Sequence, residues 1–326
     1  MQLVNSISKI CFYARAGQLK LYVEIAKKLI TENINIVFVT QHKKETEYIK
    51  KNINEANIYE VEDFLRINWN IKTEEYVKEV ITNYSDINIW RMLYTDRFLV
   101  NYNKDDCIKM INLHFKFFEE LFENERPKYF INEAVAFFAA YVAMVVGDKN
   151  NCTFVGTIIA RDNANKQFFF IEDLYQRNKE MERLYWEDHF DQSEIKDATD
   201  YLLEFRSKPK TPVYMNQYKR APRITFKLPL YPFKYLIERN KKIYKDKVAY
   251  MTYNNSFKII NAPLINYIRY KRSIKYYQKP VEGENYYLYT LHYQPEASTL
   301  VCAQKYEKQL FAIDNMAKSI PSNSML

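Results

Sequence analysis

The first half of the chain alternates short apolar runs with segments in which apolar residues recur at helical spacing. Apolar runs at residues 8–13 and 34–40 flank the segment 19–30, whose apolar side chains recur mostly three positions apart, as on one face of a helix. The second run is continuously apolar, which is typical of a strand covered on both faces. A polar helix over residues 45–51 and a third strand at residues 57–61 follow. This order predicts a βαβ beginning and a Rossmann-like parallel sheet with helices.

The same alternation resumes after a long helical middle section, residues 71–125. One face of that section is apolar and aromatic, which indicates core packing for Ile111, Phe115, Phe118 and Phe122. Pro127 then opens a second unit of strand, turn and helix. Its expected elements are a strand at 128–131, a turn at Asn132 and Glu133, a buried helix at 134–146 with Gly147 as its C-cap, and a strand at 152–159.

Polar residues follow three of the predicted strands, at the carboxyl ends where parallel sheets bind their ligands. They form the turns Arg15-Ala16-Gly17, Asn132-Glu133 and Arg161-Asp162. Each turn also has an ordinary structural interpretation: a helix N-cap for Asn132, dipole stabilisation for Glu133 and a surface ion pair for Arg161. Because glycine is scarce, at 4 of 326 residues, Gly17 and Gly147 are expected where only glycine fits.

Composition excludes several classes of protein. At 326 residues and 39.4 kDa, the chain exceeds one ordinary core, which predicts two lobes or one domain with a large appendage. Four cysteines without a Cys-x-x-Cys pair argue against a disulfide framework and a zinc site. Missing GxGxxG and Walker patterns exclude classical dinucleotide enzymes and P-loop kinases. The longest apolar run has 13 residues, where a membrane span needs about 20, and no secretory signal is visible, so a cytoplasmic location is expected.

The charge is concentrated in residues 205–280. This basic segment holds 19 Lys and Arg residues and two acids, a balance of 19 − 2 = +17, whereas the whole chain carries +8. Aromatic residues and prolines are interleaved with the cations. Such a segment suits an anionic membrane surface, a nucleic acid or simply solvent. The membrane surface is favoured by the motifs described next, and no nucleic-acid partner is expected.

The run near the end of the chain concentrates polar chemistry after a predicted strand. Residues 286–291 (YYLYTL) predict a strand, and His292-Tyr293-Gln294-Pro295-Glu296-Ala297-Ser298-Thr299 follows it. A helix with Leu310, Ile313 and Ala317 on one face is then expected. Ser298 or Thr299 would cap that helix and leave backbone N–H groups for a phosphate. His292 or Glu296 could serve as a general acid or base.

This HYQPEAST run resembles the donor-binding turn of bacterial capsular and surface polysaccharide biosynthesis proteins, GT-B-like glycosyltransferases that include Kdo transferases. The resemblance is close over residues 286–321 and faint over residues 8–180, and the stretch 161–173 is similar to a further family segment without its glycines. It implies a GT-B-like α/β enzyme that needs no metal or cofactor. Its substrates would be a nucleotide sugar, with a CMP-linked one as a candidate, and a glycan or lipid-linked acceptor.

The resemblance also assigns residues to the two sides of a cleft. The donor side would comprise His292, Gln294, Glu296, Ser298, Thr299 and Arg161, and the acceptor side Arg15, Gly17 and Glu133. Glu133, Glu296 and His292 are the implied catalytic residues. The expected divisions are an acceptor-side domain at 1–200, the connecting segment at 201–285, and the beginning of a donor lobe at 286–326, which is expected to be incomplete because a doubly wound lobe takes roughly 100 residues.

The expected function is therefore glycosyl transfer in capsular or surface polysaccharide biosynthesis, with the protein peripheral on the inner face of the membrane. Two alternatives stay open on the residues alone. One is a catalytically incomplete remnant that binds a membrane or partner through residues 205–280. The other is a polyol-phosphate transferase of teichoic-acid type, which would bind CDP-glycerol.

Overall fold

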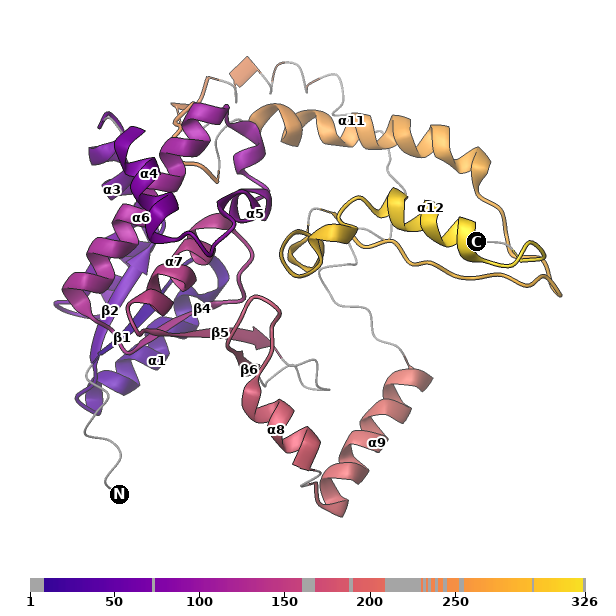
Figure 1. Cartoon of the computed structure of the whole chain (residues 1–326), viewed down its shortest axis with the longest axis horizontal. Coiled ribbons are helices and arrows are strands. Elements are labelled where there is room, and N and C mark those ends of the chain that lie inside the picture. The colour runs from indigo at the N-terminus through magenta and orange to yellow at the C-terminus, as the bar shows by residue number, and fades with distance from the viewer. Residues whose placement is uncertain are drawn as a thin grey trace. The chain divides into compact units, whose positions relative to one another are not determined.

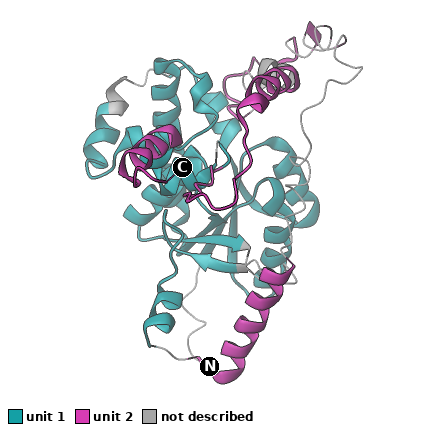
Figure 2. Cartoon of the chain, turned by 90° about the vertical axis from the view of Figure 1, so that its right-hand side faces the viewer, with its two compact units in different colours: residues 1–189, 293–307 teal, residues 190–292, 308–326 magenta. Residues whose placement is uncertain are grey.

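The computed structural model describes residues 9–71, 74–159, 168–187, 190–208, 230, 233, 236–237, 240–242, 245–251, 255–294 and 296–324. They belong to two compact units (Figure 2). The first unit comprises residues 1–189 and 293–307, and the second comprises residues 190–292 and 308–326. The sequence-based division at residues 200 and 285 groups the chain differently, because residues 293–307 here join the unit that holds the sheet.

The first unit is built on a six-stranded sheet of order β3-β2-β1-β4-β5-β6 (Figure 1). Five strands are parallel and the last is antiparallel: β1 Lys9–Tyr13, β2 Asn35–Thr40, β3 Asn57–Glu60, β4 Tyr129–Glu133, β5 Thr153–Ile159 and β6 Phe168–Ile171. The predicted Rossmann-like α/β fold is confirmed. The chain builds outward from β1 in one direction and from β4 in the other, so the strand order reverses between these two neighbours. Ligands of open parallel sheets bind at such a reversal.

Both faces of the sheet are buried, which explains the continuously apolar strands. On one face, α1 (Leu19–Thr31) contributes Tyr22 and Val23 to a core with Phe12 and Phe38. On the opposite face, α6 (Lys104–Glu125) and α7 (Phe138–Lys149) pack together, and Phe118 of α6 contacts the rings of β1 and β4. Figure 1 shows these helices on opposite sides of the strands.

The remaining helices described for the first unit lie in the connections between strands, except the last, which follows β6. They are α2 (Lys43–Asn52), α3 (Val61–Asn68), α4 (Glu74–Asn83), α5 (Ile89–Tyr94) and α8 (Lys179–Glu187). Side-chain caps begin two of the helices in this unit. Asn88 accepts the Arg91 N–H at 3.0 Å to start α5, and Asn103 accepts the Asp106 N–H at 2.8 Å to start α6.

The start of α7 differs from the prediction. Asn132 and Glu133 lie in β4 and not in a turn, and α7 begins at Phe138 and not at residue 134. Gly147 is inside the helix, and Asn150 is its C-cap. A Cβ atom at position 147 would lie 3.2 Å from Cζ of Phe122, so the glycine serves the close approach of α7 to α6.

The second unit contains α9 (Gln192–Ser207), α11 (Asn255–Ser273) and α12 (Gln309–Ser319). The predicted terminal helix is confirmed as α12. The strand predicted at residues 286–291 is wrong: Tyr286 forms an isolated bridge and the residues after it are not in a strand. Residues 209–229 of the basic segment lie outside the described residues. Within the part of the chain that the structure describes, no helix combines the length and apolarity needed to cross a bilayer.

His114 couples the stability of the fold to pH. It is fully buried on α6, with Nδ1 2.7 Å from the carbonyl oxygen of Met110 and its ring against that of Phe138. Burial lowers the pKa of His114 to about 4, although the bond to Met110 opposes this. Because the unfolded histidine titrates near 6.5, the unfolded chain binds more protons between these values, and stability falls as the pH falls.

We expect His114 to remove about 3 kcal/mol from the free energy of unfolding between about pH 7 and pH 4. Urea unfolding at a series of pH values measures this loss. His114→Phe keeps a buried ring without a titrating group and should flatten the dependence, whereas His292→Phe, at an exposed position, should not. Equal acid losses in the wild type and His114→Phe would contradict the assignment.

Candidate functional site

The carboxyl ends of β1 and β4, where the strand order reverses, bring two predicted residues together. Arg15 follows β1 and Glu133 ends β4, and Nη2 of Arg15 forms an ion pair with Oε1 of Glu133. Their side chains are 16% and 28% exposed, so both reach solvent only in part. The guanidinium Cζ of Arg15 also lies 3.8 Å from the ring centroid of Phe137. Arg15 is therefore held between a carboxylate and an aromatic face, and Glu133 is held by Arg15.

A second carboxylate, that of Glu45, ties the loops after β1 and β2 together. Its Oε1 accepts the N–H of Ala16 at 2.9 Å, and its Oε2 accepts the N–H groups of Gln41 and His42 at 2.8 and 3.0 Å. Backbone N–H groups after the first strand of such sheets are a common anion site. Here the carboxylate of Glu45 binds these donors.

The left-handed residue of the loop after β1 is Ala16 and not Gly17. Ala16 has a φ of 45°, whereas a Cβ atom at Gly17 would have no heavy atom within 4 Å. The expectation that only glycine fits at position 17 is therefore wrong. The acceptor-side role of Gly17 stays a prediction.

His42 is bound to the acidic group at the start of α3. Its Nδ1 lies 2.6 Å from Oε1 of Glu62. Burial alone would lower the pKa of His42, but the hydrogen bond and charge of Glu62, together with the charge of Glu45, raise it above its usual value. This edge of the sheet therefore combines three carboxylates, one guanidinium and an imidazole whose protonated form is stabilised.

Two fully buried amides lie at the same edge. Gln41 follows β2, and its Oε1 accepts the hydroxyl of Tyr13 at 2.6 Å. Among the described residues, Nε2 of Gln41 and both polar side-chain atoms of Asn132 have no hydrogen-bond partner. A buried polar atom without a partner costs about 1–3 kcal/mol. Both amides are fully buried, so a ligand hydroxyl could complete their bonding only if this edge of the sheet opens locally.

Sequence reasoning named Asn132 as a turn residue and missed Gln41. The only signal for Gln41 is its position directly after the apolar run at residues 34–40, at the end of a predicted strand. A single glutamine there has no recognisable motif, since its importance depends on Tyr13 and Glu45, which come from other elements.

The predicted donor-side residues that belong to the first unit form hydrogen bonds within residues 294–307. Ser298 Oγ donates to Oε2 of Glu296 at 3.0 Å, and Thr299 Oγ1 donates to the Glu296 carbonyl oxygen at 3.1 Å. Nε2 of Gln294 donates to the carbonyl oxygen of Glu307. Neither Ser298 nor Thr299 caps a helix as expected, because α12 begins at Gln309 with Lys308 as its N-cap.

The segment that contains these residues is anchored to the first unit. Cys302 Sγ donates to the carbonyl oxygen of Leu174 at 3.4 Å, and Nε2 of Gln304 donates to that of Arg91 at 3.1 Å. Thr299 and Val301 are buried. Residues 298–304 therefore pack against α5 and the turn after β6.

The other predicted site residues are not joined to these contacts. His292 belongs to the second unit, where its backbone N–H and carbonyl bind the side chain of Gln309 at 2.7 and 2.9 Å. Arg161 and Pro295 lie outside the described residues.

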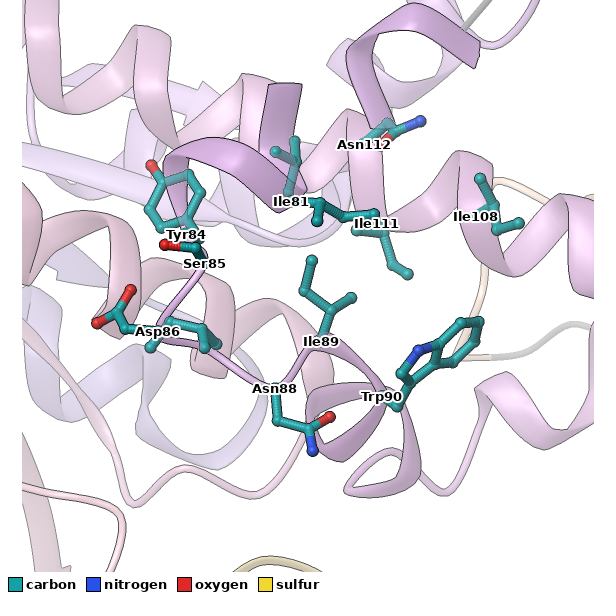
Figure 3. A pocket seen from close by; sticks show the side chains of 12 residues that line it. Ile81, Tyr84, Ser85, Asp86, Asn88, Ile89, Trp90, Ile108, Ile111 and Asn112 are labelled. Carbon is teal, nitrogen blue, oxygen red and sulfur yellow. The ribbon is translucent and has the colours of Figure 1, made fainter. Parts of the chain in front are cut away.

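A separate cavity of about 550 Å³ lies between α4, α5 and α6 (Figure 3). Its lining is mainly apolar, and its residues include Ile81, Tyr84, Asp86, Ile89, Trp90, Ile108 and Ile111. Among the described residues that line it, only Asp86 is charged. This lining suits apolar groups and not a hydroxyl-rich substrate, and it contains none of the predicted site residues.

Among the residues that the structure describes, no three His, Cys, Asp or Glu side chains are grouped so that they could hold a metal ion. No protein-family model and no curated protein matches this chain.

Proposed function

We propose that the protein is a glycosyltransferase of capsular or surface polysaccharide biosynthesis, which transfers a sugar from a nucleotide-activated donor to a glycan or lipid-linked acceptor. The observation that carries this proposal is the group of polar side chains at the carboxyl ends of β1, β2 and β4. There the Arg15–Glu133 ion pair accompanies the buried amides of Gln41 and Asn132. Carboxylate and amide groups together suit the hydroxyl groups of a sugar.

Glu133 is the proposed general base. An oxygen of its carboxylate takes the proton of the acceptor hydroxyl while the hydroxyl oxygen bonds to the anomeric carbon of the donor sugar. The bond between that carbon and the phosphate oxygen breaks, and the nucleotide leaves with the bonding electrons. Arg15 acts as a positioning residue, because it holds the carboxylate and is itself held by the Phe137 ring.

The resemblance of residues 292–299 to the donor-binding turn of surface polysaccharide enzymes supports the identity of the donor. In this proposal His292, Gln294, Glu296, Ser298, Thr299 and Arg161 bind the nucleotide sugar and stabilise the leaving phosphate. Glu296 is the second candidate for the base. Glu133 is favoured because the Glu296 carboxylate accepts a hydrogen bond from Ser298, two residues away in the chain, whereas Glu133 lies at the reversal of strand order.

Ligand-dependent stabilisation tests the donor. The full chain is titrated with CMP-, UDP- and GDP-sugars, with CDP-glycerol, and with ATP as a control, and its unfolding temperature is measured. A ligand at about 100 times its Kd adds about 2.7 kcal/mol, which corresponds to about 5–10 °C for a domain of about 200 residues. We expect a sugar nucleotide to produce this shift and ATP not to.

Two other outcomes contradict the proposal. A shift with CDP-glycerol alone would reassign the site to polyol-phosphate transfer. If none of these ligands raises the unfolding temperature, the chain binds no nucleotide-sugar donor and the proposed glycosyl transfer is contradicted.

A further inference from the structure

The second unit carries a strongly basic helix. Residues 247–281, which include α11, contain seven Lys and Arg residues and no Asp or Glu. Positive charge extends across residues 205–280 of the sequence. The structure now shows how part of that charge is arranged relative to apolar side chains.

One face of α11 combines cations with exposed aliphatic residues. Ile265, Ile268, Arg269 and Arg272 follow i, i+3, i+4 and i+7 spacing, so they share a helix face. The two isoleucines are 38% and 41% exposed, and both arginines are exposed. A merely solvated basic helix gives no reason for isoleucine between its cations.

The chain after α11 extends this surface with tyrosines. Ile274, Tyr276 and Tyr277 are 45%, 72% and 69% exposed. Nζ of Lys275 lies 4.9 Å from the ring centroid of Tyr276. Tyrosine is enriched at membrane–water interfaces because its ring is apolar and its hydroxyl is hydrated.

We infer that this surface, residues 265–277, docks on anionic phospholipid, with the cations at the headgroups and the isoleucine and tyrosine side chains at the boundary of the acyl chains. Anionic lipid complements the charge, and the aliphatic residues find apolar surroundings there. The phosphates of a single-stranded nucleic acid would pair with the cations equally well, and its bases would stack on aromatic rings. It offers no comparable partner for Ile265 and Ile268. The inference is independent of the proposed enzyme activity.

Vesicle flotation with the full chain tests this docking surface. The vesicles consist of phosphatidylcholine with or without phosphatidylglycerol. We expect binding only with the anionic lipid. The double variant Arg269→Glu/Arg272→Glu should lower the partition coefficient about tenfold or more, because each cation near an anionic surface contributes about a fivefold change.

A second variant separates the apolar contribution, and a third controls for net charge. Ile265→Ser/Ile268→Ser should weaken binding severalfold, and the loss should persist at higher salt because burial of apolar area is not screened. Lys50→Glu/Lys51→Glu makes the same charge change at exposed positions of α2 and should bind as the wild type does. Circular dichroism confirms that each variant is folded.

Three results would overturn the inference. They are equal binding to neutral vesicles, an equal loss in the Lys50/Lys51 variant, and serine variants that bind as tightly as the wild type. Salt-dependent binding to a single-stranded oligonucleotide without vesicle binding would identify a nucleic-acid surface instead.

Discussion

Glu133→Gln is expected to lower the rate of glycosyl transfer about 10²- to 10⁴-fold, the usual contribution of a positioned general base. Glutamine keeps the size of the side chain and one acceptor oxygen, but it cannot take the proton of the acceptor hydroxyl. The experiment follows radiolabelled sugar from a nucleotide donor into an acceptor glycan. Donor-induced stabilisation should be retained, because Glu133 is placed on the acceptor side.

Glu24→Gln is the matched control for this substitution. Glu24 forms an exposed ion pair with Lys27 on α1, at 2.7 Å, and its replacement should leave transfer unchanged. If Glu133→Gln transfers sugar at the wild-type rate while Glu296→Gln does not, the base is Glu296. A bell-shaped pH profile that loses its acidic limb only in Glu133→Gln would separate proton transfer from a positional effect.

Asp96→Ala is expected to destabilise the first unit by about 3–5 kcal/mol, because it leaves three N–H groups without their acceptor in the interior. Oδ1 of Asp96 accepts the N–H groups of Phe98 and Leu99 at 2.6 and 3.0 Å, and Oδ2 accepts that of Phe138 at 2.8 Å. Burial raises the pKa of Asp96, although these three bonds lower it. Urea unfolding measures the loss.

Asp105→Ala supplies the comparison, because Asp105 is an exposed residue in the first turn of α6. Its replacement should change the unfolding free energy by no more than about 0.5 kcal/mol. Similar losses in both variants would remove the structural role assigned to Asp96. The ring of Phe137, the residue before Phe138, lies against Arg15. Loss of Asp96 should therefore also weaken the Arg15–Glu133 ion pair and lower the rate of glycosyl transfer.

The helix after β4 shows why the local pattern of apolar residues predicts that a helix exists better than it predicts where the helix begins and ends. The apolar run from Ala134 to Val146 predicts a helix, and α7 is that helix. Its first turn is set by Asp96, a residue 42 positions earlier whose carboxylate binds the Phe138 N–H. Helix ends depend on which acceptors and donors are satisfied, and here the acceptor comes from the loop that follows α5.

The strand predicted at residues 286–291 shows the opposite case. Its aromatic and β-branched composition favours an extended chain, but a strand also needs a neighbour for its hydrogen bonds. In the described structure only Tyr286 finds such a partner, as an isolated bridge. The residue pattern therefore predicted strand pairing that the described structure shows only at Tyr286.

Residue patterns alone predicted the parallel sheet and its helical crossovers, and they placed Arg15 and Glu133 at the ends of strands, but the ion pair between these two residues is seen only in the structure. Apolar periodicity follows from burial on both faces, and the carboxyl ends of parallel strands share one edge. The folded chain was needed to show that Glu45 binds the loop N–H groups, that Gln41 and Asn132 are buried amides at the same edge, and that residues 293–307 join the unit of the sheet. These features depend on contacts between residues far apart in the chain, which leave no spacing in the sequence because each partner is chosen by the folded packing around it.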